Sequence, residues 1–381
     1  MVAVKARAVY LMLILRGREV VGVSVHPTAI IANGAEIGRN VEIGPYSVIG
    51  PHARIGDGCR IHHLATIEGY TTIGQGCEVY PQAVLGARPQ DLKFAGERTT
   101  LEIGNHNIFR EMVTIHPGTG NGGGVTQIGD RNLFMIGVHV AHDTIIGNHC
   151  IFANHVQLAG HIHVENNVNM GGQCGVHHFV TIGKHAFVGG MTRVAADVPP
   201  FVVLVAARGT RSEVRMINGV GLQRSGYSED DIAALKDAYM KLFARRARQS
   251  GTAISDRVQT LLATRDLNPH VKYLCDSLMR SFAHGRHGRY LESLRNDPVH
   301  RNTWKPQNRF SLIVEVEGKG IVYKAASPAP DKVHEVLELT ARAEPGWAFS
   351  GWNGSLSGRN NPESVVLDRN MTVAATFVQC R

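Results

Sequence analysis

Aliphatic residues recur at every sixth position of the chain from Val25 to Pro199, with two interruptions. Glycine often follows the aliphatic residue, and the fifth position is small, as at Ala29, Ala35, Val41, Ser47, Ala53 and Cys59. An α-helix has a period of 3.6 and a β-strand a period of 2, so neither element produces this pattern. A fixed repeat of this length is typical of a solenoid.

Three six-residue units, or hexads, predict one triangular coil of eighteen residues with a short parallel strand on each face. The aliphatic residue points inward, and the small fifth residue fits where the prism narrows. Glycine at the second position is expected at a tight corner with a positive φ. Stacked coils are about 4.8 Å apart, the spacing of neighbouring strands. The pattern predicts a parallel β-helix; its left hand, against the usual crossover rule, follows from a resemblance to hexapeptide-repeat proteins.

Two polar or glycine-rich segments interrupt the repeat. The first loop, GARPQDLKFAGERTT, covers residues 86–100, and the second loop, HPGTGNGGGVTQ, covers residues 116–127. Long loops in a regular solenoid are usually functional or mobile. The alternative is a pair of tolerated surface insertions.

The pattern changes after the segment Asp197-Val-Pro-Pro. From Ser228 a capped helix with a stripe of apolar residues is expected, followed by two or three further helices to about Leu294. Their exposed faces carry basic residues: Arg245, Arg246, Arg248, Lys272, Arg280, Arg286 and Arg289. From Phe310 the chain alternates apolar and polar residues around PGWAFSGWNGSLSG, which resembles the bacterial B-repeat, a small β domain in which Trp347 and Trp352 belong to the core.

The fold class is therefore mainly β: a left-handed parallel β-helix followed by a small α-helical domain and a small C-terminal β domain. The expected parts are an N-terminal extension (1–22), the β-helix (23–207), the helical domain (208–298), a linker (299–309) and the B-repeat-like domain (310–381).

Composition narrows the functional classes. A length of 381 residues with 43 % hydrophobic residues indicates more than one domain. The net charge of +8 suggests an acidic partner or substrate, and the lack of Lys/Arg runs interleaved with aromatics argues against nucleic acid. The apolar segment Ala8–Leu15 is too short to span a membrane and has no cleavage motif, so a cytoplasmic protein without a transmembrane segment is expected. The cysteines, with Cys59 and Cys77 eighteen residues apart and no CxxC, are expected to be core residues.

Histidine is the main candidate for chemistry. Steps of eighteen residues from His142 lead to Gly160 and His178, so one edge of three coils is expected to carry His139, His142, His161, His177 and His178. A neutral imidazole is a natural general base near pH 7, and Asp143 could orient it. Carbonic anhydrases of this fold bind zinc through three histidines, two of them in an H-x4-H spacing. No two histidines here are five residues apart, which argues against zinc.

Specific motifs cover the chain from about Val23 to Leu294: VHPTAI, PQDLKFAGE, NIFREMVTIHPGT, HVAHD, LAGH, GVHHF and VPPF. Together they resemble the UDP-N-acetylglucosamine O-acyltransferases of lipid A biosynthesis; the sibling N-acyltransferases lack the QDLK loop. The resemblance implies transfer of a 3-hydroxyacyl chain from acyl carrier protein to the glucosamine 3-hydroxyl of UDP-N-acetylglucosamine. It also implies that His142 is the general base, that Asp143 supports it and that the Gly160 amide holds the oxyanion.

Further roles follow from the same resemblance. Asp91 and Lys93 would contact the nucleotide sugar, and Gly190, which leaves room for a longer chain, would gauge acyl length. Substrate positioning would fall to Gln90, His139, His161, His177, His178, Asn218 and Arg224. The family is a homotrimer with sites between subunits, docks acyl carrier protein on its basic helical domain, and uses no metal or coenzyme.

The chain departs from the family at three positions: His178 replaces a glutamine, Val220 an acidic residue and Ser225 the second of two arginines. Two alternatives therefore remain. The same fold and base could act on a different UDP-amino-sugar, or the β-helix could be a non-catalytic scaffold that presents the B-repeat-like domain.

Overall fold

The computed structural model describes residues 23–207, 212–284, 288–294, 312–327, 335–367 and 371–380. The expected N-terminal extension (1–22) and linker (299–309) lie outside these residues. The chain forms two compact units that divide between Trp304 and Lys305.

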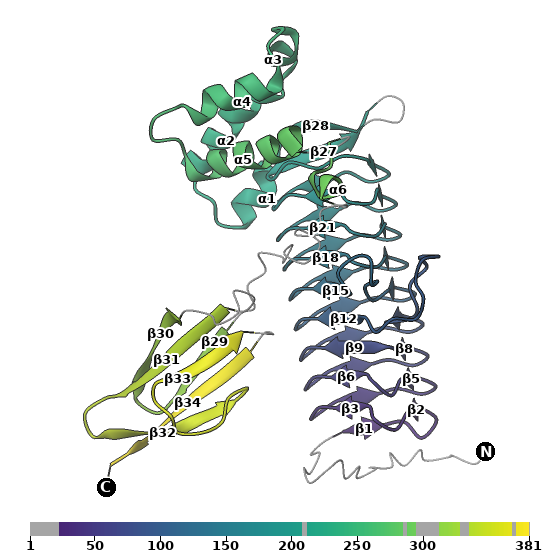
Figure 1. Ribbon diagram of the computed structural model, residues 1–381, viewed down its shortest axis with the longest axis vertical. Coiled ribbons are helices and arrows are strands. Elements are labelled where there is room, and N and C mark those ends of the chain that lie inside the picture. The colour runs from purple at the N-terminus through teal and green to yellow at the C-terminus, as the bar shows by residue number, and fades with distance from the viewer. Residues whose placement is uncertain are drawn as a thin grey trace, which may run out of the picture. The chain divides into compact units, whose positions relative to one another are not determined.

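Residues 24–206 form the left-handed parallel β-helix that the hexads predict (Figure 1). Its first sheet contains β1 (Ser24–Val25), β4 (Glu42–Ile43), β7 (Arg60–Ile61), β10 (Glu78–Val79), β13 (Ile108–Phe109), β16 (Leu133–Phe134), β19 (Ile151–Phe152), β22 (Asn169–Met170), β25 (Phe187–Val188), β27 (Val202–Ala206) and the antiparallel β28 (Ser212–Ile217). The second contains β2 (Ile30–Ile31), β5 (Val48–Ile49), β8 (Thr66–Ile67), β11 (Val84–Leu85), β14 (Thr114–Ile115), β17 (His139–Val140), β20 (Gln157–Leu158), β23 (Gly175–Val176) and β26 (Arg193–Val194). The third contains β3 (Glu36–Ile37), β6 (Arg54–Ile55), β9 (Tyr70–Ile73), β12 (Thr100–Ile103), β15 (Val125–Ile128), β18 (Ile145–Ile146), β21 (His163–Val164) and β24 (Thr181–Ile182).

The interior of the β-helix is built from the two positions that the repeat singles out. The aliphatic or aromatic residue that opens each hexad is buried in almost every coil, and so is the small fifth residue. Phe109, Phe134 and Phe152 open hexads of successive coils, and their rings stack with centroids 5.1 and 4.9 Å apart. The hexad cysteines Cys59, Cys77, Cys150 and Cys174 are free and buried, as predicted, and so is Cys275, whereas Cys380 is free and exposed.

The expected role of the second-position glycine is wrong. The positive φ falls at the fourth position instead, for example at Asn40, Tyr46 and Asp143. A second-position glycine is needed because neighbouring coils approach closely: a Cβ on Gly56 would lie 2.7 Å from the main-chain carbon of Gly74. The corner turns two residues later than the glycine, so the glycine provides space rather than conformational freedom.

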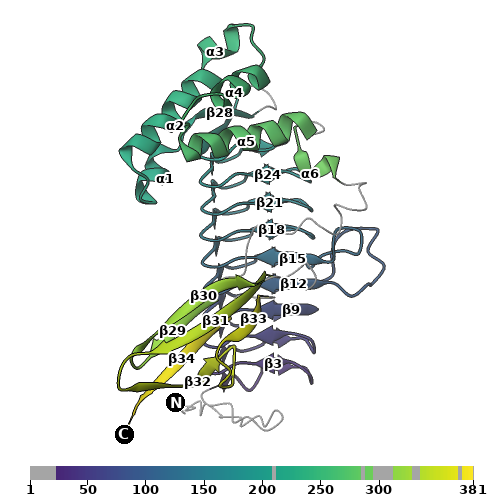
Figure 2. The ribbon, with the colours of Figure 1, turned by 60° about the vertical axis from the view of Figure 1, so that its left-hand side comes forward.

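The two loops are insertions at one corner, between the second and third sheets. Ile103 pairs with Ile73, thirty residues earlier, and with Ile128, twenty-five residues later, rather than at the usual spacing of eighteen. The inserted segments leave the β-helix beside β12 and β15 (Figure 2). They are tied together, because the Gly120 N–H donates to Glu97 Oε1 over 2.7 Å.

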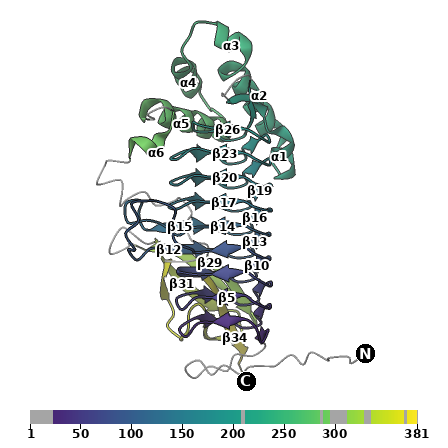
Figure 3. The same cartoon turned by 90° about the vertical axis from the view of Figure 1, so that its right-hand side faces the viewer.

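A helical part covers the end of the β-helix (Figure 3) and shares its hydrophobic core. It consists of α1 (Gly219–Arg224), α2 (Glu229–Leu242), α3 (Arg245–Gln249), α4 (Ile254–Leu262), α5 (Pro269–His284) and α6 (Tyr290–Ser293). Ser228 caps α2 as predicted, since its side chain accepts from the Asp231 N–H. None of the described helices combines the length and the apolar character needed to cross a membrane.

Most of the expected basic residues of this part are exposed: Arg245, Arg246, Lys272 and Arg280. Arg286 and the side chain of Arg248 lie outside the described residues. The expectation for Arg289 is wrong, because its side chain is buried, donates to Ala195 O over 2.8 Å and pairs with Glu292. Arg289 fastens the end of the helical part to the β-helix.

His185 is expected to make the stability of this junction depend on pH. Burial first, and then the charges of Lys184 and His270, lower its pKa from 6.5 to about 4. The neutral ring is therefore favoured in the folded state, so stability is complete above pH 6.5 and is lost as pH falls toward 4. His185→Asn is expected to remove up to about 3 kcal/mol of this pH-dependent loss. Urea unfolding at pH 7 and 4.5 measures it.

His149→Asn is the matched control. His149 occupies the same corner position two coils earlier with the same backbone conformation (φ of 57° against 56°), but its ring is exposed. This variant should keep the wild-type pH dependence. A His185→Asn protein that loses stability in acid as steeply as the wild type would contradict the assignment.

The C-terminal unit is a small β domain of two three-stranded sheets. One contains β29 (Leu312–Glu317), β34 (Met371–Gln379) and β32 (Trp347–Gly354), and the other β30 (Gly320–Ser327), β31 (Glu335–Ala343) and β33 (Glu363–Leu367). Trp352 is 2 % exposed and donates to Asn360 O over 2.8 Å, while Trp347 packs beside it against the same core. Both tryptophans therefore serve the core, as predicted.

Candidate active site

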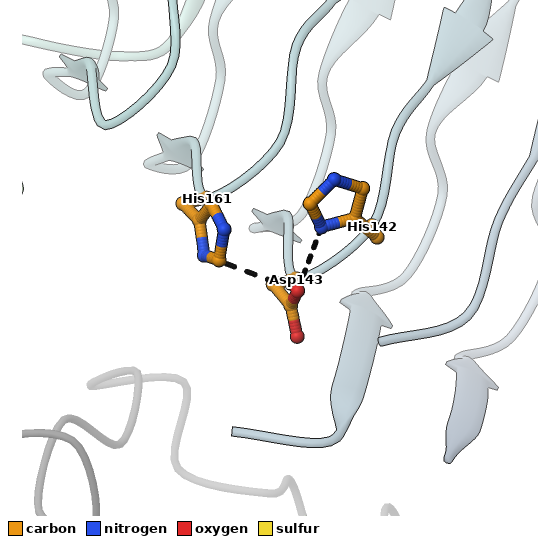
Figure 4. A group of neighbouring side chains, drawn as sticks. All are labelled: His142, Asp143 and His161. Carbon is orange, nitrogen blue, oxygen red and sulfur yellow. Dashed lines mark hydrogen bonds and ion pairs between the residues drawn. The ribbon is translucent and has the colours of Figure 1, made fainter. Parts of the chain in front are cut away.

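His142 and Asp143 form a buried pair at the corner between β17 and β18, the same corner from which both loops emerge. His142 Nδ1 lies 2.8 Å from Asp143 Oδ2, and the two residues are 8 % and 4 % exposed (Figure 4). An ionised carboxylate only accepts hydrogen bonds, so this contact favours the tautomer of the neutral ring that carries the proton on Nδ1 and the lone pair on Nε2. This arrangement prepares Nε2 to accept a proton.

The second loop closes over Asp143. Thr119 donates to the carboxylate through both its N–H and its hydroxyl, and the Asp143 N–H donates to Thr126 Oγ1 over 2.8 Å. A Cβ on Gly122 would lie 2.0 Å from the carboxylate carbon, so only glycine fits there. Sequence reasoning identified this loop but not Thr119, because the loop has no period that places its residues over the neighbouring coil.

The next coil brings Gly160 and His161 against the pair, as the eighteen-residue step predicts. A Cβ on Gly160 would lie 2.7 Å from His142 Cε1. The rings of His142 and His161 meet edge to face with centroids 5.1 Å apart, and His161 stacks on Phe179 at 4.6 Å. His161 Nδ1 lies 3.9 Å from Asp143 Oδ2.

His139, from the same coil, and His116, from the preceding coil, join the group. The ring of His139 lies 2.8 Å from Thr114 Oγ1 and 5.1 Å, between centroids, from the ring of His116. Burial, followed by the charges of His139 and His142, lowers the pKa of His116 to about 4, and burial also lowers the pKa of His139. Both rings are therefore neutral near pH 7. Sequence reasoning missed His116, although it directly follows the hexad leader Ile115.

Five further expected residues lie near the His142 corner or in the first loop. His177 and His178 lie exposed at the corner of His142, one coil beyond Gly160. Gln90, Asp91 and Lys93 lie in the first loop, where the Lys93 N–H donates to Asp91 Oδ1 over 3.0 Å.

Three expected site residues lie away from the His142 corner. Gly190 lies between β25 and β26, at the corner between the first and second sheets. Asn218 caps α1 and donates to His185 O over 2.9 Å, and Arg224 is exposed at the end of α1. The described chain therefore does not bring these residues to His142.

His142, Asp143 and His161 are the one group of potential metal ligands whose atoms converge in the described residues, within 4.8 Å of one another. Both carboxylate oxygens already accept hydrogen bonds, Oδ1 from Thr119 N–H and Oδ2 from the Thr119 hydroxyl and His142. This donor set fits an oriented base better than a metal centre.

Treatment with EDTA, followed by dialysis, is therefore expected to leave any catalytic activity of the chain within about twofold of the untreated protein, because an oriented imidazole needs no metal to accept a proton. Steady-state rates before and after treatment, with metal analysis of both samples, measure the effect. A loss that zinc or another divalent cation restores would show that the cluster is a metal centre.

Three family models match the chain. One described as UDP N-acetylglucosamine O-acyltransferase, domain 2, matches residues 197–286, and the bacterial transferase hexapeptide model matches residues 52–87 and 126–160. The divergent InlB B-repeat model matches residues 310–380.

Two relatives are named as acyl-(acyl-carrier-protein)–UDP-N-acetylglucosamine O-acyltransferases. The protein from Nautilia profundicola is 47 % identical over 203 residues, 53 % of this chain and 75 % of the relative. The protein from Synechocystis is 44 % identical over 273 residues, 71 % of this chain and 95 % of the relative.

Solved structures give the same picture. The Acinetobacter baumannii enzyme matches with a TM-score of 0.61 and 38 % identity, covering 66 % of this chain and 95 % of that one. The UDP-N-acetylglucosamine acyltransferase of Francisella novicida matches with a TM-score of 0.63 and 30 % identity, covering 67 % and 90 %.

Proposed function

Because the chain belongs to the UDP-N-acetylglucosamine O-acyltransferase family, we propose that it moves a 3-hydroxyacyl chain from acyl carrier protein to the glucosamine 3-hydroxyl of UDP-N-acetylglucosamine, the first step of lipid A biosynthesis. The observation that carries the proposal is the buried His142–Asp143 pair directly against Gly160. A family member that retains this pair retains the means to activate a hydroxyl.

His142 acts as the general base. Its Nε2 takes the proton of the sugar 3-hydroxyl while the hydroxyl oxygen attacks the thioester carbonyl. Asp143 holds the ring through Nδ1 and stabilises the imidazolium that forms. When the tetrahedral intermediate collapses, the C–S bond breaks and the imidazolium returns the proton to the leaving thiolate.

Gly160 stabilises the oxyanion of that intermediate. Its N–H donates to no acceptor in the described part of the chain, and the residue lies against the His142 ring. A main-chain donor beside the base is suited to hold charge that develops in the transition state.

The substrates bind around this corner. Asp91, Lys93 and Gln90 of the first loop contact the nucleotide sugar, with the Lys93 ammonium near phosphate. His139, His161, His177 and His178 position the reacting groups. The acidic carrier protein docks on the exposed arginines and lysine of the helical part, in the cytoplasm.

A homotrimer completes the site. The corner between the first and second sheets exposes large apolar side chains at its fourth positions: Tyr46, Leu64, Met112 and Met191. Such a row suits burial against a neighbouring subunit. Assembly through this edge would bring Gly190, at the same corner, to the His142 corner of a second subunit. Asn218 and Arg224, which lie elsewhere on the chain, also position substrate.

Mass spectrometry of the product made by the full chain from a mixed acyl-carrier-protein pool tests the proposal. UDP-N-acetylglucosamine and its 3-amino analogue are supplied in separate reactions, because His178 and Val220 depart from the family. An O-acylated UDP-N-acetylglucosamine is expected, and its mass gives the acyl length. Acylation of the amino analogue alone would assign a different acceptor, and no binding of either sugar would favour the scaffold.

A further inference from the structure

Thr119 holds the Asp143 carboxylate at two points. Its N–H donates to Oδ1 over 2.9 Å and its hydroxyl donates to Oδ2 over 2.6 Å. Thr119 is 1 % exposed and Asp143 is 4 % exposed, so water competes little for either contact. Hydrogen bonds to an ionised group in such a dry site are stronger than neutral ones.

The same carboxylate oxygen serves both Thr119 and His142. Oδ2 accepts from the Thr119 hydroxyl and from His142 Nδ1, and Oδ1 is engaged by the Thr119 N–H. A rotation of the carboxylate about its Cβ–Cγ bond would therefore break at least one contact with Thr119. The direction in which Asp143 presents Oδ2 to His142 depends on this two-point contact.

Thr119 is itself fixed by the second loop. The N–H groups of Gly122 and Gly124 both donate to its carbonyl, over 3.0 and 2.9 Å, and the Gly120 N–H ties the loop to Glu97. Gly122 packs against the carboxylate, where no side chain fits. The glycine-rich sequence thus forms a tight turn that carries one hydroxyl to the catalytic pair.

The geometry points to Thr119 as a positioning residue that orients Asp143 and, through it, keeps the proton of His142 on Nδ1 and the lone pair on Nε2. This role rests on the proposed function of His142 as the base. Thr119 acts only through Asp143, and the alternative role is that of a simple anchor for the loop.

Thr119→Val removes the hydroxyl and keeps the shape and the main-chain donor. We expect kcat to fall about 10- to 100-fold while both KM values stay within about threefold, because orientation rather than binding is lost. The pH profile of kcat/KM should change as well, because the hydrogen-bond partner of His142 is no longer fixed. Thr119→Ser, which keeps the hydroxyl, should recover most of the rate.

Two comparisons separate positioning from anchoring. Thr71→Val is the matched control: Thr71 of β9 is equally buried, but its hydroxyl donates to Glu68 O, three coils before the His142 corner. It should keep the wild-type kcat and pH profile. In an Asp143→Asn background, Thr119→Val should lower kcat little further, because the effects of substitutions at residues that act as a unit are not additive.

The spectrum of ¹⁵N-labelled histidine supplies a readout that needs no activity. The wild type should show a single Nδ1–H tautomer for His142, and Thr119→Val a mixture. Unchanged kinetics and an unchanged tautomer in Thr119→Val would overturn the inference. It would also be overturned by a loss of kcat that Thr119→Ser does not recover and that adds fully to the effect of Asp143→Asn. A wild type without transferase activity would instead overturn the proposed function, and the tautomer would still decide the role of Thr119.

Discussion

Replacing His142 by alanine is expected to lower kcat for acyl transfer to UDP-N-acetylglucosamine by about 10²- to 10⁴-fold, the usual contribution of a positioned general base. The KM for the sugar should change much less, because the proton moves only in the transition state. Single-turnover rates with a 3-hydroxyacyl carrier protein as donor measure the chemical step directly. The variant should fold, since the main-chain bond from the His161 N–H to His142 O does not involve the ring.

His149→Asn controls for a general effect of removing an imidazole. His149 is exposed at a different corner of the prism, and asparagine tolerates its positive φ. Its rate should match the wild type. If His142→Ala and the wild type turn over equally slowly, the general-base mechanism fails and the scaffold alternative gains support.

The sequence was sufficient to predict the coil and the stacking at its corner. The hexad fixes which residues lie inside, and its eighteen-residue step places His142, Gly160 and His178 one above another. That prediction succeeds because the strand register repeats in every regular coil, as Ile145 pairs with His163 and His163 with Thr181. Residues at equivalent positions of successive coils are therefore neighbours in space.

Contacts that cross the insertions could not be predicted in this way. His116 reaches His139 only because the second loop adds seven residues to one coil and so brings Ile115 opposite Val140. Thr119 reaches Asp143 through a turn of glycines, whose conformation no period specifies. The positive φ at the fourth position was also missed, because Asn, Tyr, Asp and His occupy it as readily as glycine does.

The distribution of site residues beyond the His142 corner has a related cause. The six-residue period assigns each residue to a face or corner of its own β-helix. It gives no information about contacts with another chain. From the family resemblance, Gly190 was expected to gauge acyl length and Asn218 to position substrate, and the chain places both away from the His142 corner. The sequence therefore predicts the neighbours of the His142–Asp143 pair well and the placement of Gly190 and Asn218 poorly.

Gly160→Ala is expected to lower kcat by about 10²-fold although it removes no functional group. The added methyl would lie 2.7 Å from His142 Cε1 and 2.9 Å from Nε2, closer than carbon and nitrogen approach without a shift. The ring is held at Nδ1 by Asp143, so relieving the contact must tilt Nε2 away from its position. A misplacement of about 1 Å at a reacting group costs about 10²-fold in rate.

Gly175→Ala separates this effect from a general cost of adding a methyl to the β-helix. A Cβ on Gly175 meets no atom within 4 Å, so this variant should keep the wild-type rate and stability. Urea unfolding of Gly160→Ala should show a loss of about 1–3 kcal/mol, the usual range for overpacking, which leaves the protein folded under assay conditions. Because the Gly160 N–H is unchanged, a Gly160→Ala enzyme within threefold of the wild-type kcat would mean that the position of the His142 ring does not limit the reaction. A fall in rate accompanied by a shifted pH profile would indicate that the methyl disturbs the base His142 rather than the oxyanion donor.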